Sequence, residues 1–237
     1  MFFYEPSYML IMIVGFALVM IPQFVVKSTY AKYAKVNNEH GLTGAEVARA
    51  ILENAGFTSV RVEAVAGELT DHYDPTNNVV RLSESNYYGK SIAAIGVSAH
   101  EIGHVIQDKT DFVPMKLRAA LVPAANIGQS LGPILIMVGI ALRAFAHVGG
   151  LSDIVALTGI VFYASIVVFH LVTLPVELDA SYRAIAILSN GGYIETNERP
   201  AAMKVLSAAA MTYIATALYA LMELVYWIWR LYGSRRD

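Results

Sequence analysis

The chain contains no cysteine, which excludes both disulfide bonds and metal sites built from thiolates. Any metal ion must therefore be held by histidine, aspartate or glutamate. Charged residues are also scarce: they make up 15% of the 237 residues, whereas 56% are hydrophobic, a balance that is unusual for a soluble globular protein. The formal net charge is -2 and no basic block stands out, so the composition gives no indication of a nucleic-acid partner.

Four long apolar runs predict helices that cross a membrane, because the hydrocarbon core takes about 20 apolar residues in a helix. They are residues 6–26, 119–142, 154–176 and 205–229, the last interrupted only by Glu223. The segment before the first run lacks a positive charge and no clear cleavage site follows, so we interpret this run as a retained anchor. The predicted fold class is a mainly α integral membrane protein with about four transmembrane helices.

The distribution of lysine and arginine predicts the orientation of these helices. Basic residues follow the first run and separate the third run from the fourth, so both segments are expected in the cytoplasm. These residues are Lys27, Lys32, Lys35, Arg183, Arg199 and Lys204. The loop 146–153 has no lysine or arginine, as expected for the outer side. Arg230, Arg235 and Arg236 oppose this arrangement, and the orientation of the C-terminal tail stays open.

Residues 29–118 form the one long polar stretch, and their pattern predicts a small α+β domain. Thr43 followed by Glu46 is a capping box that begins a helix, and Gly56 is a plausible stop. Alternating β-branched residues predict short strands at 60–65 and 79–82, with a turn at 74–78 between them. A helix is expected from about 91 to 108. This order of helix, strands and helix is the one that a zincin-type half-domain needs.

The last predicted helix contains the sequence SAHEIGHVIQ, in which His100 and His104 lie one helical turn apart. Both side chains can therefore point at one ion. Glu101 lies about 100° around the helix axis, the position of a residue that takes the proton of a metal-activated water. The surrounding residues are uncharged, so the helix can be buried with these three polar residues on its active face. The motif predicts a zinc site that uses one ion per chain.

A third ligand must come from elsewhere in the chain. The segment 177–204 follows the third run and is predicted to begin with a helix that carries Glu177 and Asp179 in its first turn. Either carboxylate would complete the set of ligands found in thermolysin-type sites. A carboxylate at the N-terminus of a helix can also serve only to balance the helix dipole. Spacing alone leaves these alternatives open.

Other polar residues have less certain roles. His72 is interpreted as a turn residue, with a ligand or oxyanion role as the alternative, and Asp71 could orient a ligand histidine. The residue that stabilises the oxyanion stays open among His72, Tyr73, Tyr182 and Arg183. His170 lies inside the third run, where an ionisable group is costly and often functional, but a neutral histidine in a helix bundle can also be satisfied by one backbone carbonyl. Glu223 and Arg143 lie near the ends of runs and are expected to reach toward the membrane surface.

Three blocks of sequence resemble the YugP-type membrane zinc metallopeptidases of bacteria: SAHEIGHVIQ, LTDHYDPTNNVVRLS upstream and TLPVELDASYRA downstream. The resemblance covers nearly the whole chain, and the family is similar in plan to the HtpX-like membrane proteases. It implies His100 and His104 as zinc ligands, Glu101 as catalytic base and Glu177 as the third ligand. HtpX-like enzymes have an aspartate four residues after the third ligand, where this chain has Ser181, so that supporting role does not transfer to Asp179.

The predicted function is a multi-pass zinc endopeptidase of the cell membrane, with its catalytic site on the cytoplasmic side and membrane-associated or unfolded proteins as substrates. The alternative is a zinc-binding membrane scaffold or a transporter without proteolytic activity. The oligomeric state stays open. The sequence divides into five predicted regions. Residues 1–28 are an anchor and 29–118 a zincin-like polar domain. Two transmembrane helices (119–176), a helix with the third ligand (177–204) and a fourth membrane helix with a basic tail (205–237) follow.

Overall fold

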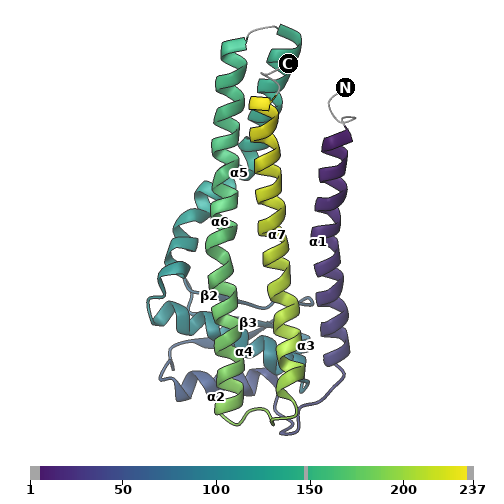
Figure 1. Cartoon of the computed structure of the whole chain (residues 1–237). Helices are drawn as coiled ribbons and strands as arrows, with labels where there is room; N and C mark the ends of the chain where they lie inside the picture. The colour runs from purple at the N-terminus through teal and green to yellow at the C-terminus, as the bar shows by residue number, and fades with distance from the viewer. Residues whose placement is uncertain (1–5, 147–148, 234–237) are drawn as a thin grey trace. The chain divides into compact units, whose positions relative to one another are not determined.

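The computed structural model describes residues 6–146 and 149–233 (Figure 1). These residues divide into two compact units, each of which is described by itself. The first unit holds the described parts of 1–20, 116–174 and 213–237, and the second holds 21–115 and 175–212. Arg235 and Arg236 lie outside the described residues.

Four helices among the described residues are long and apolar enough to cross a membrane. They are α1 (Pro6–Tyr33), α5 (Val113–Ala141, continued by a π-helical turn over Leu142–Ala146), α6 (Gly149–Asn190) and α7 (Arg199–Gly233). Each of the four predicted apolar runs lies within one of these helices. The predicted fold class, a mainly α membrane protein with a small α+β part, is confirmed.

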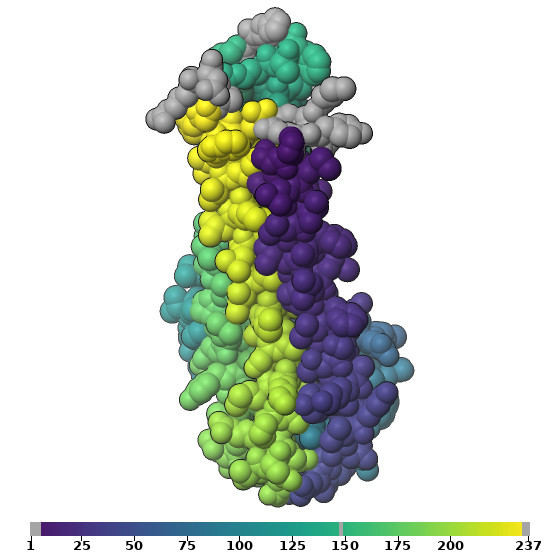
Figure 2. All heavy atoms as spheres, turned by 45° about the vertical axis from the view of Figure 1, so that its right-hand side comes forward, coloured from purple at the N-terminus to yellow at the C-terminus, as the bar shows by residue number. Residues whose placement is uncertain are grey.

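Small residues hold the helices of the first unit together. A Cβ atom added to Gly139 of α5 would lie 2.6 Å from the backbone nitrogen of Ala156, and one added to Gly159 of α6 would lie 2.6 Å from that of Ile136. Close approach through small residues is typical of helix packing in membranes. Figure 2 shows the first part of α1, in purple, lying along the last part of α7, in yellow, where the rings of Tyr8 and Tyr226 are 5.4 Å apart.

The second unit begins with the end of α1 and continues into α2 (Gly44–Asn54). The predicted capping box is confirmed: Thr43 Oγ1 accepts from the backbone nitrogen of Glu46, and the Glu46 side chain accepts from the backbone nitrogen of Thr43. Such a cap is worth about 1 kcal/mol of stability. The helix ends at Asn54, and Gly56 takes the left-handed conformation with φ of 76° that glycine adopts without strain.

Three strands of the second unit form one sheet in the order β1-β3-β2. The strands are β1 (Arg61–Val65), β2 (His72–Asp74) and β3 (Val79–Ser83). β1 and β3 are parallel, with Arg61 opposite Val79, and β2 is antiparallel to β3, with His72 opposite Arg81. The two predicted strands are present, while β2 and the short helix α3 (Glu84–Tyr87) were not predicted.

α4 (Ile92–Lys109) packs its apolar residues into the core of the second unit. Figure 1 shows α2, α4 and the strands gathered around the end of α6 and the start of α7, which the 191–198 turn connects. The core includes Leu82 of β3, Ile102 and Val105 of α4, and Leu188 of α6, all fully buried. The sheet, α4 and α6 therefore share one core, which fixes α4, the helix that carries His100, Glu101 and His104, against α6.

The expectation of a separate helix beginning at Glu177 is wrong. α6 runs without a break through Pro175, so Glu177 lies in mid-helix and cannot serve as an N-terminal dipole partner. The helix ends at Asn190, and two residues later Gly192 has a φ of 68°, the left-handed conformation that glycine adopts without strain. Pro175 removes one backbone donor but does not end the helix, which tertiary contacts of the next turns hold.

Candidate metal centre

The orientation of the two motif histidines follows from the burial of α4. Ser91 caps this helix by accepting from the backbone nitrogen of Ala94 at 3.1 Å. Ala99, Ile102 and Val105 are fully buried in the core and fix the rotation of the helix about its axis. His100 and His104 then lie on a neighbouring face, one turn apart, with 14% and 11% of their side chains exposed. The two histidine rings are therefore partly exposed to solvent, on a helix whose rotation about its axis is fixed by packing.

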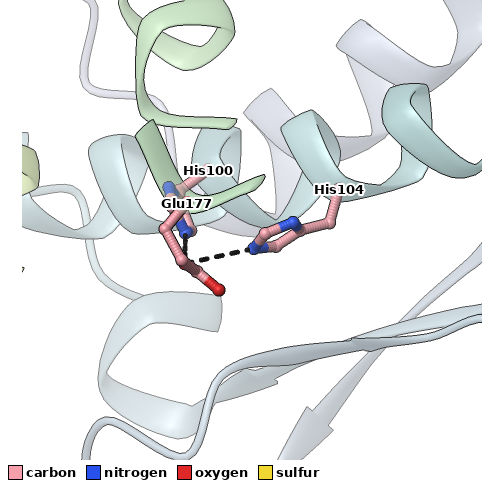
Figure 3. Close-up of side chains that lie close together, drawn as sticks. All are labelled: His100, His104 and Glu177. Atoms are coloured by element: carbon pink, nitrogen blue, oxygen red, sulfur yellow. Dashed lines mark ion pairs between the residues drawn. The ribbon is translucent and has the colours of Figure 1, made fainter. Parts of the chain in front are cut away.

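The second element of the centre is Glu177 of α6, whose side chain is 3% exposed. Its Oε2 lies 3.4 Å from His100 Nε2 and 3.6 Å from His104 Nε2. Figure 3 shows both rings turned toward this carboxylate. Within the described residues, these three side chains form one group whose ligand atoms all lie within 4.8 Å of one another.

The spacing of these atoms fits a tetrahedral zinc ion. Zinc binds histidine nitrogen and carboxylate oxygen at about 2.1 Å, so two ligands of a tetrahedral ion are about 3.4 Å apart. The two distances from Glu177 Oε2 to the ring nitrogens are 3.4 and 3.6 Å. Two imidazoles and one carboxylate are also a donor set that zinc accepts in catalytic sites, where a fourth position stays open.

The far sides of both rings are engaged in hydrogen bonds. His104 Nδ1 lies 3.0 Å from Gln107 Oε1, and His100 Nδ1 lies 3.2 Å from Ser181 Oγ. A histidine ligand to a metal typically donates its other N–H in this way, which fixes the ring and its tautomer. Each ring therefore offers Nε2 to the space beside Glu177.

Charge and burial at the centre shift the pKa of two groups on α4. Burial raises the pKa of Glu101, which is 7% exposed, and the nearby His104 and His100 only partly offset this effect. Burial alone would lower the pKa of His104, but its hydrogen bond to Glu177 and the charge of Glu101 outweigh it and raise that pKa. A carboxylate with a raised pKa is better matched to accepting and returning a proton near neutral pH.

Asp179, the alternative ligand, lies outside the group of three. Its Oδ2 accepts from Gln107 Nε2 at 2.8 Å and from Arg183 Nε at 2.5 Å. Asp179 thus faces the end of α4 and is bound to an amide and a guanidinium rather than to the histidines. Arg183, considered for the oxyanion, is engaged in this ion pair, and its guanidinium lies over the ring of Phe112 at 5.7 Å.

Residues 71–73 make hydrogen bonds outside the group of three proposed ligands. Asp71 accepts from the backbone nitrogen of Ser83 at 2.8 Å and from Asn86 Nδ2 at 2.9 Å, which ties β3 to α3. His72 is exposed on β2, with Nδ1 2.8 Å from the carbonyl oxygen of Thr70. Tyr73 donates to Asp108 Oδ2 at 2.9 Å. Tyr182, the other residue considered for the oxyanion, is 74% exposed.

The polar residues of the apolar runs belong to the first unit. Glu223 of α7 accepts a hydrogen bond from Tyr163 of α6, so its carboxylate is turned to a neighbouring helix rather than only toward the membrane surface. Arg143 donates to Asp153 Oδ1 at 3.1 Å. His170 is half-buried next to Phe169, with ring centroids 5.6 Å apart. The contacts of Glu223 and Arg143 connect neighbouring helical segments of the first unit, whereas the ring contact of His170 lies within α6.

Two residues of the centre, Gln107 and Ser181, were not predicted to take part. Gln107 lies three residues after His104 and Ser181 four residues after Glu177, so each shares a helix face with a proposed ligand. That spacing was the available signal. Their partners, however, lie on the other helix, and no pattern within one segment indicates which pairs of helices meet.

Comparison with known proteins points to the same chemistry. A family model described as "Putative neutral zinc metallopeptidase" matches residues 8–232. The chain is 46% identical over 203 residues to the "Putative membrane protease YugP" of Bacillus subtilis (strain 168), a match that covers 86% of this chain and 87% of that protein. No solved structure was found to match the chain. The resemblance drawn from the three sequence blocks is confirmed.

Proposed function

The chain belongs to the zinc metallopeptidase family whose model matches residues 8–232, and we propose that it is an integral-membrane zinc endopeptidase. In this proposal His100, His104 and Glu177 hold one zinc ion, and Glu101 is the catalytic base. The observation that carries the proposal is the convergence of two Nε2 atoms and one carboxylate oxygen at 3.4 and 3.6 Å. Helices distant in sequence contribute these atoms, so chance spacing within one helix does not explain the arrangement.

Zinc bound to this donor set would polarise the peptide carbonyl and lower the pKa of water to about 7. Glu101 then takes a proton from the attacking water and returns it to the leaving amine. Its burial supports this role, because a raised pKa lets the carboxylate hold the proton between the two steps. Ser181 and Gln107 hold the rings of His100 and His104 in place while the proton moves.

The proposed substrates are membrane-associated or unfolded protein segments. Glu177 directly follows the apolar run 154–176 on the same continuous helix, which supports a centre near the end of a membrane-crossing segment. Peptide bonds close to the membrane surface would therefore meet the proposed zinc site. The basic residues of the flanking segments favour the cytoplasmic side.

We also propose that the predicted regions work as follows. Residues 1–28 anchor the chain, 29–118 form the zincin-like domain, and 177–204 supply the third ligand. The grouping of 21–115 and 175–212 in one compact unit supports this division, because it joins the motif helix to the segment that holds Glu177. Residues 119–176 and 205–237 then supply the remaining membrane helices and the tail.

Cleavage of an unfolded protein by the purified, detergent-solubilised chain tests the proposed activity. Casein is incubated with zinc-loaded wild type, with Glu101→Gln and with Glu53→Gln, which changes an exposed carboxylate of α2 as a matched control. We expect the wild type and the control to cut, and Glu101→Gln to retain zinc but lose at least about 100-fold in rate, because the proton transfer is lost. Cutting by Glu101→Gln at the wild-type rate would contradict the role of Glu101.

A zinc-binding scaffold is the second candidate, because the same three ligands would serve it. A scaffold has no need of a buried carboxylate beside the metal, and Glu101 is such a residue. Zinc binding without cleavage of casein or of any membrane-protein substrate would favour it. A transporter has less support, because transport sites usually lie on broken membrane helices. α5 is instead helical through Pro123 and Pro133, and Gly139 packs against α6 without interrupting the helix.

A further inference from the structure

Gln107 is a fully buried polar side chain in the last part of α4, three residues beyond His104. Its amide makes three hydrogen bonds. Nε2 lies 2.7 Å from the carbonyl oxygen of Val176 and 2.8 Å from Asp179 Oδ2, and Oε1 lies 3.0 Å from His104 Nδ1. Burying a polar amide costs free energy unless it is hydrogen-bonded, and here both its donor and its acceptor atoms have partners. One side chain thus connects the motif helix to two residues of α6.

The partners of Gln107 fix which way its amide points. The carbonyl of Val176 and the carboxylate of Asp179 are acceptors, so the amide nitrogen must face them. Arg183 Nε donates to the same oxygen of Asp179 at 2.5 Å, which keeps this oxygen an acceptor. The amide oxygen of Gln107 must therefore face His104.

This orientation in turn sets the tautomer of His104. An amide oxygen can only accept, so Nδ1 of His104 must carry the proton in the hydrogen bond to Gln107. In the neutral ring the lone pair then lies on Nε2, the atom 3.6 Å from Glu177 Oε2. Of the two neutral tautomers of His104, the hydrogen bond to Gln107 thus selects the one whose Nε2 can bind a metal.

Gln107 also fixes the position of the third ligand. Val176, whose carbonyl it holds, directly precedes Glu177 in α6. His104 and Glu177 belong to different helices, and the Gln107 side chain is hydrogen-bonded to the first and to the backbone next to the second. A single amide therefore controls both the direction of a histidine ring and its separation from the carboxylate.

We propose that Gln107 is the positioning residue of the zinc site, which selects the metal-binding tautomer of His104 and holds α6 at the correct distance. The inference rests on the proposed function in one respect, the identity of the three zinc ligands. In this proposal Asp179 is not a zinc ligand: its Oδ2 is an acceptor that orients the Gln107 amide.

Zinc affinity and the spectrum of bound cobalt test this proposal without any assay of activity. The full-length chain is stripped of metal in detergent and titrated with Zn²⁺ against a competing chelator, then loaded with Co²⁺ for visible spectroscopy. In Gln107→Met the side chain keeps a similar volume but loses all three hydrogen bonds. We expect its zinc affinity to fall about 10- to 100-fold and its cobalt bands to shift, because the ring and the carboxylate are no longer fixed.

Two further variants separate positioning from a general loosening of α4. Tyr73→Phe removes the hydrogen bond to Asp108, the residue after Gln107, and touches no ligand. It should lower thermal stability but leave zinc affinity and the cobalt spectrum unchanged. Gln107→Glu keeps an acceptor for His104 but has no donors for Val176 and Asp179, so its zinc affinity should lie between those of wild type and Gln107→Met.

Each outcome decides a different point. Wild-type affinity and spectrum in Gln107→Met would overturn the positioning role and leave the zinc site standing. Equal loss in Gln107→Met and Tyr73→Phe would also overturn it, since a loosened helix would then be the cause. Equal affinity of Gln107→Glu and Gln107→Met would overturn the selection of the tautomer. A wild-type chain that binds no zinc would overturn the proposed function itself.

Discussion

Gly103 lies directly against the backbone of Ala180: a Cβ atom added to this glycine would be 2.7 Å from the carbonyl oxygen of Ala180 and 3.1 Å from its Cα. Gly103 precedes His104 in α4, and Ala180 follows Glu177 by three residues in α6. The two helices therefore touch through their backbones beside the proposed zinc ligands. The absence of a side chain at Gly103 lets α4 and α6 approach closely enough for His104 and Glu177 to bind one ion in the proposed site.

Replacing Gly103 by alanine should therefore weaken zinc binding. Backbone atoms cannot give way as a flexible side chain can, so α6 must move or the helices must bend. We expect a loss of about 1–3 kcal/mol in stability, the usual cost of overpacking. Zinc affinity should fall at least about tenfold, because the ligands and the side chains that orient them move with the helix. A competition titration of the metal-free protein measures it.

Gly96→Ala is the matched control for this change. Gly96 is in the same helix, and an added Cβ atom would meet no atom within 4 Å. This variant should keep the wild-type zinc affinity and gain up to about 1 kcal/mol of stability from better helix propensity. If Gly103→Ala binds zinc as tightly as Gly96→Ala, the close approach of α4 and α6 does not set the site.

Ser181→Ala should reduce zinc affinity less than the Gln107 substitutions do. The Ser181 hydroxyl makes one hydrogen bond to the ring of His100, at 3.2 Å, whereas Gln107 also ties α4 to α6. We expect a fall of up to about tenfold. Ser189→Ala, which removes another hydroxyl of α6 that has no hydrogen bond within the described residues, should leave the affinity unchanged. Equal affinities in the two variants would show that Ser181 does not orient His100.

Single cysteines can test the orientation in the membrane, because the natural chain has none. Lys35→Cys lies in an exposed position after α1, and Phe145→Cys replaces a side chain that is 84% exposed beyond α5. We expect a membrane-impermeant maleimide to label Phe145→Cys in intact cells and Lys35→Cys only after lysis. The reverse pattern would place the proposed zinc site outside the cytoplasm.

Much of the fold could be predicted because its elements depend on local signals. The membrane helices follow from long charge-free runs, and the start of α2 follows from the Thr43 and Glu46 capping box. β2 was missed because its three residues form a strand only through pairing with β3, with Tyr73 opposite Val80. The continuity of α6 was missed because Pro175 and the onset of charge at Glu177 resemble a boundary, whereas packing keeps the segment helical.

The site was predictable only in part for a related reason. His100, Glu101 and His104 share one helix, where spacing alone indicates a common face. Spacing could not choose between Glu177 and Asp179, since both lie on one segment. The structure places Glu177 beside the histidines and Asp179 against Gln107 and Arg183, but the ligand roles stay a prediction until a metal is measured.

The zinc affinity of two isosteric variants tests the central claim most directly. Glu177→Gln and Asp179→Asn each remove one negative charge from α6 and change the side-chain volume little. If Glu177 is the third ligand, Glu177→Gln should lose at least about 100-fold in zinc affinity, because an amide is a poor zinc ligand. Asp179→Asn can still accept from Gln107 and should stay within a few-fold of wild type. A large loss in Asp179→Asn together with wild-type affinity in Glu177→Gln would contradict the account.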